Sequence, residues 1–213
     1  MSEVIIVDFN LGNLHSVKKA CEVCNISARV SSQKSDIKKA KALILPGVGA
    51  FGEAMSNLKK LDLINSITDF VESGRPLFGI CIGLQLLFSE SSEFGFTKGL
   101  NLINGKVEKI TLENQEIYKN FRIPFIGWNK IEFKKRSSLF DYINVGNFFY
   151  FIHSYCVKLE SSKDSIASST YGDQEVTAAI ERNNIFATQF HPEKSGKNGL
   201  QIYKNWKTKY NLN

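Results

Sequence analysis

The sequence PLFGICIGLQLLFSE, residues 76–90, places a cysteine between two different backbone patterns. Residues 76–80 form an apolar run typical of a buried strand, and GLQLLFSE after it follows the pattern of a helix. Glycines stand two residues before and two residues after the cysteine, at Gly79 and Gly83. A strand, a Gly-x-Cys-x-Gly turn and a helix predict a nucleophile elbow, a turn too sharp for side chains at the two flanking positions.

The elbow gives Cys81 a predicted chemical role. Held in a strained conformation at the carboxyl end of its strand, Cys81 would meet the positive end of the helix that we expect to begin near Gly83, which favours a thiolate. A buried cysteine in a glycine-containing turn is the structural alternative for this motif taken alone. Its position between an apolar strand and an amphipathic helix favours the nucleophile.

Strands and helices also alternate upstream of the elbow. Strands are predicted at residues 3–8, 27–32 and 41–45, the first and third of them apolar, and helices at residues 14–24, 52–60 and 62–73. Repeated units of this length imply right-handed crossovers and a largely parallel sheet with helices on both faces. The first half of the chain is therefore predicted to be a doubly wound α/β structure.

The second half of the chain has a different sequence pattern, with short segments rich in β-forming residues. They are GKVEKI, WNKIEF, NFFYFIHSY, SIASSTY, EVTAAIER and NIFATQF, between residues 105 and 190. We expect them to extend the sheet or to add a small side layer, and a helix at residues 198–209 to close the fold. Without an internal repeat or a Pro-rich linker, residues 1–213 are expected to form a single domain.

Composition narrows the class of protein. Hydrophobic residues make up 43% and charged residues 23% of the 213 residues, as in ordinary globular proteins. The sequence contains no long apolar run and no basic, signal-like start, so we expect a soluble, cytoplasmic protein without a membrane partner. The net charge is +6, but Lys and Arg are scattered, which favours a solvated surface over nucleic-acid binding and leaves open a face for an acidic partner.

The other cysteines, Cys21, Cys24 and Cys156, are predicted to be free thiols. Cys21 and Cys24 form a C-x-x-C, for which zinc binding and redox chemistry are alternatives. No second Cys or His pair completes a metal set, and the two residues fall late in a predicted helix, away from the strand end where a redox pair gains activation. We expect buried thiols there, and no metal site.

His191 is the candidate general base. It lies in ATQFHPEKS, where it ends an apolar strand, and strand ends on one edge of an α/β sheet converge on one crevice that also holds Cys81. Glu193, two residues later, is close enough to orient the imidazole through a hydrogen bond. A structural histidine is the alternative for a lone His-Pro pair. His153 is expected to fill a strand end beside the pocket, and His15 to belong to the first helix.

The loop PGVGAFG, residues 46–52, follows the third predicted strand and can turn backbone N–H groups toward the nucleophile. Preorganised donors of this kind stabilise the oxyanion that forms when a thiolate attacks a carboxamide. The expected donors are Val48 or Gly49, together with Ile82. Phosphate binding is the alternative, but the loop has neither a Walker lysine nor a dinucleotide fingerprint.

Six ordered blocks carry a resemblance that covers nearly the whole chain. They are DFNLGNL (8–14), LPGVGAF (45–51), GICIGLQLLF (79–88), GWN (127–129), YFIHSY (150–155) and QFHPEKS (189–195). The chain resembles the class I glutamine amidotransferases, and within them the glutaminase subunits of imidazole glycerol phosphate synthase in histidine biosynthesis. The resemblance implies a flavodoxin-like, three-layer α/β/α fold with a central, mostly parallel mixed sheet and a β-rich C-terminal half.

The resemblance also implies roles for the candidate residues. Cys81 would attack the side-chain amide of glutamine to form a thioester, His191 would protonate the departing ammonia and then activate water, and Glu193 would orient His191, without a cofactor. The positions that hold substrate glutamine in the family match Gly49, Gln85, Ser154 and Tyr155. Val48 matches a backbone N–H that must rotate to complete the oxyanion hole, a switch that would keep the resting enzyme poorly active.

A partner is implied as well. Ammonia would pass to a separate (β/α)8 cyclase subunit in a heterodimer, and Gly127, Trp128 and Asn129 resemble the interface loop beside that passage. The chain departs from the family at Asn10, where Gly is usual, and at Phe125, where His is usual, both near the expected partner face. These departures leave open a sugar-modifying amidotransferase as the partner. A non-catalytic regulatory subunit and a redox protein using the C-x-x-C are alternatives of other classes.

Overall fold

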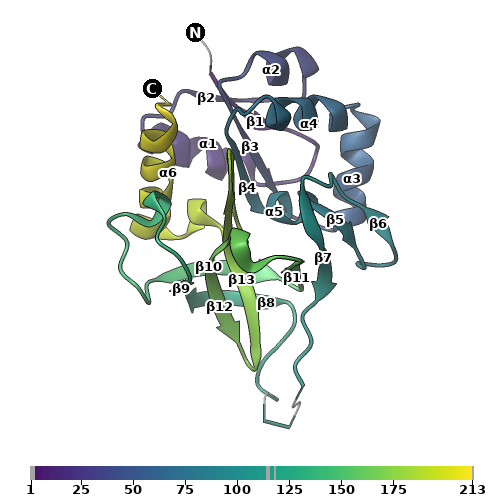
Figure 1. The fold of residues 1–213 in the computed structure, drawn as a ribbon, viewed down its shortest axis with the longest axis vertical. Coiled ribbons are helices and arrows are strands. Elements are labelled where there is room, and N and C mark those ends of the chain that lie inside the picture. The colour runs from purple at the N-terminus through teal and green to yellow at the C-terminus, as the bar shows by residue number, and fades with distance from the viewer. Residues whose placement is uncertain (1–2, 114–115, 118, 213) are drawn as a thin grey trace.

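A computed structural model describes residues 3–113, 116–117 and 119–212, and its centre is an eight-stranded mixed sheet with the order β2-β1-β3-β4-β14-β13-β12-β9 (Figure 1). Its strands are β1 (Val4–Val7), β2 (Ala28–Ser31), β3 (Ala42–Gly47), β4 (Leu77–Cys81), β9 (Glu132–Phe133), β12 (Ser165–Tyr171), β13 (Gln174–Arg182) and β14 (Ile185–Thr188). The five strands from β2 to β14 run parallel, and the other three are antiparallel to their neighbours.

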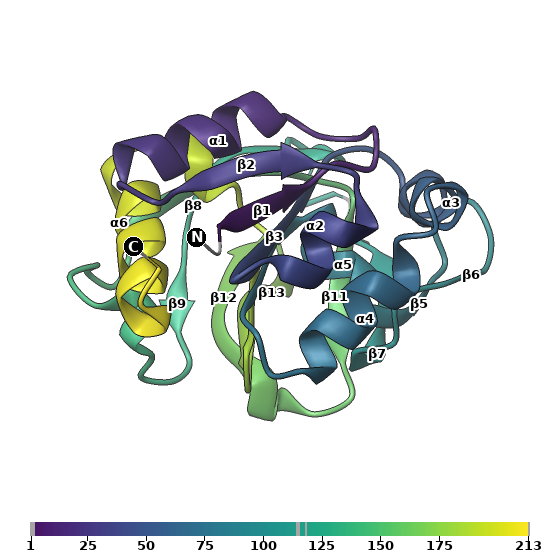
Figure 2. The ribbon, with the colours of Figure 1, turned by 90° about the horizontal axis from the view of Figure 1, so that it is seen from above.

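Helices cover both faces of this sheet (Figure 2). They are α1 (Leu14–Val23), α2 (Lys34–Lys39), α3 (Phe51–Lys60), α4 (Ile64–Glu72), α5 (Ile82–Leu86) and α6 (Gly196–Tyr210). Alternate strand residues point to opposite faces, so Ile6 and Ile44 pack in one core with α1 and α6, whereas Ile5 and Leu43 pack in the other with α2 to α5. The arrangement is the expected three-layer α/β/α fold.

Two smaller sheets complete the β-rich half. A two-stranded ribbon pairs β8 (Phe125–Lys130) with β10 (Phe148–His153), and a four-stranded sheet has the order β11-β7-β5-β6. Its strands are β5 (Phe88–Ser91), β6 (Thr97–Lys98), β7 (Ile103–Lys109) and β11 (Tyr155–Leu159). Short 3-10 turns η1 (Ser138–Phe140), η2 (Ser162–Asp164) and η3 (Pro192–Lys194) connect elements. The late segments therefore do both things expected of them: β9, β12, β13 and β14 extend the main sheet, and the others form side layers.

One local expectation was wrong, and one helix was missed. The helix predicted for GLQLLFSE ends at Leu86, because the Leu86 carbonyl accepts a hydrogen bond from the backbone N–H of Leu100 and the following residues enter the side sheet as β5. Helix α2 was not anticipated, since only Ile37 of its six residues is buried and so short a helix leaves no periodic signal.

The register brings three strand ends together. Gly47 of β3 pairs with Cys81 of β4, and Thr188 of β14 pairs with Ile80 of β4, so the chain leaves all three strands at the same edge of the sheet. The loop after β3, the elbow after β4 and the segment after β14 consequently meet there, which is the convergence expected of an α/β sheet.

Candidate active site

Cys81 occupies the predicted elbow. Its backbone has φ 54° and ψ −106°, a conformation that residues with a side chain rarely adopt, and α5 begins at the next residue. A Cβ at Gly83 would lie 1.7 Å from the Leu45 carbonyl oxygen, and one at Gly79 would lie 2.9 Å from the Gly83 carbonyl oxygen. The expectation that both flanking positions must be glycine is therefore confirmed. Helix α5 has only five residues, so its dipole is smaller than the sequence suggested.

His191 and Glu193 form a buried pair just beyond β14. Nδ1 of His191 donates to Oε1 of Glu193 over 2.7 Å, and both side chains are 2% exposed. The backbone is fixed on both sides, since the His191 N–H donates to the Tyr150 carbonyl over 2.9 Å and Oγ of Ser195 donates to the His191 carbonyl over 2.6 Å. The imidazole therefore has one defined orientation.

The electrostatics of His191 tie it to Cys81. Burial by itself lowers the pKa of the imidazolium, but the charge of the Cys81 thiolate beside it and the hydrogen bond to Glu193 outweigh burial and raise this pKa to about 10. Nε2 of His191 has no hydrogen-bond partner of ordinary geometry in the part of the chain that the structure describes. This nitrogen is thus available for proton transfer.

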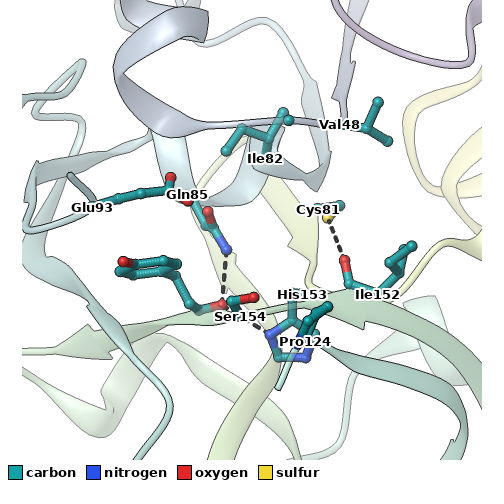
Figure 3. Close-up of a pocket in the computed structure, with 11 residues that line it drawn as sticks. Val48, Cys81, Ile82, Gln85, Glu93, Pro124, Ile152, His153 and Ser154 are labelled. Carbon is teal, nitrogen blue, oxygen red and sulfur yellow. Dashed lines mark hydrogen bonds between the residues drawn. The ribbon is translucent and has the colours of Figure 1, made fainter. Parts of the chain in front are cut away.

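The loop after β3 passes directly beside the nucleophile. Gly47 is aligned with Cys81, and a Cβ there would overlap the Ile82 side chain at 2.0 Å, so the glycine lets the two segments approach. Gly49 has φ 103°, which favours glycine, and Val48 is partly exposed above the elbow (Figure 3). The expected oxyanion donors Val48, Gly49 and Ile82 therefore surround one side of Cys81.

A pocket of about 210 Å³ opens at this edge of the sheet (Figure 3). It is lined by Val48, Gly49, Cys81, Ile82, Gln85, Glu93, Pro124, Ile152, His153, Ser154 and Tyr155. The four residues expected to hold glutamine all belong to this lining. Their segments, the β3 loop, α5 and the junction of β10 with β11, are far apart in the sequence, so the fold assembles the pocket.

Two polar pocket residues received no such role from the sequence. Oε2 of Glu93 accepts a 2.6 Å hydrogen bond from the N–H of Phe51, the first residue of α3, and the side chain borders the pocket (Figure 3). His153 is buried, with Nδ1 2.8 Å from the Tyr155 carbonyl, and burial lowers its pKa to about 4. His153 lies beside the pocket as expected, but no sequence pattern points to Glu93, because the turn that carries it was not predicted.

The predicted partner loop lies on the β8–β10 ribbon. Trp128 is 54% exposed, and its ring meets that of Tyr150 with 6.0 Å between centroids. Gly127 and Asn129 have the opposite parity on β8, and the Asn129 amide donates to the Thr170 carbonyl over 2.7 Å. Alternation places the following side chains on what we call the outer face of the ribbon: Ile126, Trp128, Lys130, Phe148, Tyr150 and Ile152. The sequence analysis singled out only Trp128 among them.

The other cysteines are buried free thiols, as expected. Burial raises the pKa of Cys21 to about 12 and also raises those of Cys24 and Cys156. Thiols of this kind react poorly, which argues against redox chemistry at the C-x-x-C. Within the described ranges, no three His, Cys, Asp or Glu side chains gather as metal ligands, and no helix has the length and hydropathy needed to cross a membrane.

Comparison with known proteins shows the family of this chain. The family described as glutamine amidotransferase class-I matches residues 5–209. Imidazole glycerol phosphate synthase subunit HisH of Syntrophotalea carbinolica is 43% identical over 203 residues, which are 95% of this chain and 98% of that protein. The subunit of the same name from Aquifex aeolicus is 42% identical over 206 residues, 96% of either chain.

Solved structures support the fold. The crystal structure of a glutamine amidotransferase superposes with a TM-score of 0.74 at 19% identity, covering 98% of this chain and 99% of the other. PurLQS from Thermotoga maritima gives a TM-score of 0.74 at 15% identity, covering 98% of either chain. Together with the elbow and the buried His-Glu pair, these matches show that the chain belongs to the class I glutamine amidotransferases, and within them to the family of imidazole glycerol phosphate synthase HisH subunits.

Proposed function

We propose that residues 1–213 act as a single glutaminase domain that releases ammonia from glutamine for an imidazole glycerol phosphate synthase. The observation that carries the proposal is that Cys81, on a strained elbow in the lining of a pocket, lies close enough to the buried His191–Glu193 pair to raise the pKa of His191. A nucleophile, a base and an orienting carboxylate held in this way suit acyl transfer. A non-catalytic subunit would have no need to keep such a strained residue in place.

The first half-reaction forms a thioester. The Cys81 thiolate attacks the side-chain carboxamide carbon of glutamine, and the negative charge that moves onto the carbonyl oxygen is stabilised by N–H groups of Ile82 and of Val48 or Gly49. The tetrahedral intermediate collapses by breaking the C–N bond, and Nε2 of His191 gives its proton to the departing nitrogen. The products are ammonia and a glutamyl thioester on Cys81.

The second half-reaction restores the enzyme. Neutral His191 accepts a proton from water through Nε2 while the water oxygen attacks the thioester carbon. The C–S bond then breaks, glutamate leaves, and the thiolate again faces a protonated imidazole. Glu193 stabilises that imidazolium throughout, because its hydrogen bond occupies Nδ1 and leaves Nε2 as the reacting nitrogen.

The remaining pocket residues fit the amino-acid end of glutamine. Gly49, Gln85, Ser154 and Tyr155 supply backbone and side-chain polar groups around the cavity, and Glu93 supplies the carboxylate that an α-ammonium group requires. Glu93 also accepts a hydrogen bond from the first residue of α3. Binding of substrate to Glu93 would therefore affect the position of the preceding loop, which carries Val48 and Gly49. This contact offers a route by which glutamine could influence the oxyanion loop.

The outer face of the ribbon is the proposed docking surface for a (β/α)8 cyclase in a heterodimer. Exposed Trp128 and Ile126 supply apolar area of the kind that anchors protein interfaces. Ile152 belongs to this face and also lines the glutamine pocket, so ammonia formed at Cys81 has a short way to the partner. We further propose that the complex works in the cytoplasm, since free cysteines suit a reducing compartment.

The two departures from the family pattern are compatible with this partner. Phe125 points into the protein, where it is 6% exposed and stacks on Phe151 and Tyr171, so its replacement of histidine leaves the outer face unchanged. Asn10, at a position where glycine is usual in the family, has φ 62°. Asparagine adopts this left-handed conformation more readily than most other residues with a side chain.

Reconstitution tests the proposal. The chain is mixed with the cyclase subunit of an imidazole glycerol phosphate synthase, and formation of imidazole glycerol phosphate is measured with glutamine or with ammonium salt as nitrogen donor. We expect both donors to support synthesis in the parent, and only ammonium to do so after Cys81→Ser. Glutamine hydrolysis that survives Cys81→Ser would refute the mechanism. A stable complex that hydrolyses glutamine without forming the product would instead point to a sugar-modifying partner.

A further inference from the structure

Gln189 is a fully buried polar residue that the proposed mechanism does not use. It lies between the end of β14 and His191, and its side chain is 0% exposed. Its amide nitrogen lies 3.7 Å from Sγ of Cys81, within hydrogen-bonding distance for sulfur, and its amide oxygen accepts a 3.1 Å hydrogen bond from Nε2 of Gln85. Gln189 therefore connects a pocket residue with the nucleophile.

A backbone carbonyl group determines which atoms of Gln85 and Gln189 donate and which accept. Nε2 of Gln85 also donates to the carbonyl oxygen of Tyr155 over 3.0 Å, and a carbonyl oxygen can only accept. The amide nitrogen of Gln85 must therefore face both Tyr155 and Gln189, so Gln189 must turn its oxygen toward Gln85. Its nitrogen, with two N–H donors, is left facing the sulfur, and the orientation of both amides follows from one carbonyl.

We propose that Gln189 is a catalytic residue of the glutaminase that donates an amide N–H to Sγ of Cys81 and stabilises the thiolate, with Gln85 holding the amide in the donating orientation. The inference deepens the proposed function and rests on it. Hydrogen bonds to charged acceptors are stronger than those to neutral ones, so the amide stabilises the thiolate more than the thiol.

A second contact of the sulfur has the opposite preference. Sγ of Cys81 donates to the Ile152 carbonyl oxygen at 3.8 Å, which requires the thiol proton (Figure 3). On ionisation this bond is lost and the carbonyl dipole faces a negative charge. Gln189 supplies a hydrogen-bond donor to Sγ in addition to the protonated His191 ring, and it thus offsets the preference of Ile152 for the thiol.

The test is alkylation of Cys81 by iodoacetamide, which requires the thiolate but not glutamine turnover. Gln189→Met is the sharpest variant, because its side chain has a similar length and no donor for the sulfur. Gln189→Leu also has no donor and serves as a second variant. We expect the alkylation rate of Cys81 near neutral pH to fall about tenfold in both, with the pH of half-maximal rate moved upward.

Thr188→Val is the matched control. Thr188 is also fully buried, and its hydroxyl donates to the Phe190 carbonyl over 2.9 Å, so the variant removes a neighbouring buried hydrogen bond without touching the sulfur. The control should keep the parent's rate and pH profile. Gln189 variants that fold, by circular dichroism, and that alkylate at the parent's rate and pH would overturn the proposal, even if glutamine hydrolysis had changed.

A measurement on the unmodified chain covers the case in which the variants do not fold. In ¹⁵N-labelled protein, the side-chain amide resonances of Gln189 should move as pH is raised, with the same midpoint as the alkylation rate, and should move again when Cys81 is alkylated. Resonances that stay fixed through both changes would refute the contact. Because neither readout depends on hydrolysis, the mechanism and the role of Gln189 can fail independently.

Discussion

Nδ1 of His191 and Oε1 of Glu193 lie 2.7 Å apart, with both side chains almost completely removed from solvent. A carboxylate in this position assigns the ring proton to Nδ1 and directs Nε2 toward the reaction. It also supports a positive charge on a ring that burial alone would keep neutral. The pair therefore prepares His191 to hold a proton beside the Cys81 thiolate.

The titration of His191 should reveal this ion pair. Measured by NMR of the imidazole, its pKa is expected near 10 in the parent, and it should fall in Cys81→Ala, because burial then acts without the opposing thiolate. Cys156→Ala removes another buried thiol and should leave the titration unchanged. A His191 pKa that is the same in the parent and in Cys81→Ala would contradict the ion pair.

The same shift has a consequence for stability. Because the folded-state pKa of His191 lies above the ordinary value of 6.5, the folded protein holds this proton more tightly than the unfolded chain. The stabilisation is complete below about pH 6.5 and is lost as pH rises toward 10. Urea unfolding of the parent should show a steeper decline across this window than that of Cys81→Ala.

The sequence predicted the features of the fold that depend on local pattern. The apolar strand before Cys81, the two glycines around it and the strand before His191 all leave periodic or steric signals, and the structure has them where they were expected. The predicted length of helix α5 was too great, because the hydrogen bond from Leu100 that ends the helix comes from a distant segment. Sequence periodicity carries no information about such a partner.

The positions of the candidate site residues were predictable to a similar extent. The candidate triad and oxyanion loop were predicted from strand ends, and the positions expected to hold glutamine were predicted from family resemblance. The contacts of Glu93 with Phe51 and of Gln189 with Cys81 depend on side chains whose positions the tertiary structure sets. The outer face of the ribbon required the register of β8 with β10, which the sequence alone did not supply.

The elbow should be intolerant of even one methyl group. Gly83→Ala would place a Cβ 1.7 Å from a backbone oxygen, which no rotamer change relieves, so we expect a loss of more than about 3 kcal/mol in the free energy of unfolding. Gly52→Ala, in the first turn of α3, meets only Thr97 Oγ1 at 3.4 Å and should be neutral or slightly stabilising. Denaturant unfolding compares them, and equal stability of the two variants would contradict the packing described.

Glu93→Gln should weaken glutamine binding more than it slows the reaction. The amide keeps an acceptor for the Phe51 N–H but loses the charge proposed to bind the α-ammonium group, so KM should rise about tenfold or more with a smaller change in kcat. Glu90→Gln is the control, since Glu90 lies on β5 outside the pocket lining. Steady-state glutamine hydrolysis in the presence of the cyclase gives both constants, and an unchanged KM would remove Glu93 from the substrate site.

The outer face of the ribbon should be needed for partner binding and not for folding. Trp128→Ala removes a large exposed ring that contacts Tyr150 at the edge of the fold, so the free energy of unfolding should change little. The affinity of Trp128→Ala for the cyclase should fall roughly thirtyfold, a loss of about 2 kcal/mol in binding free energy, as expected for an aromatic anchor at the centre of an interface.

Tyr142→Ala is the matched control for that prediction, because Tyr142 is 92% exposed, follows η1 and lies outside the ribbon. Calorimetric titration of each variant with the cyclase compares the two aromatic residues directly. If Tyr142→Ala weakened binding as much as Trp128→Ala, exposed aromatic area in general would be responsible. If only Trp128→Ala did so and ammonia-dependent synthesis by the cyclase persisted, the ribbon would be the docking site, because ammonia supplied from solution does not have to cross the interface.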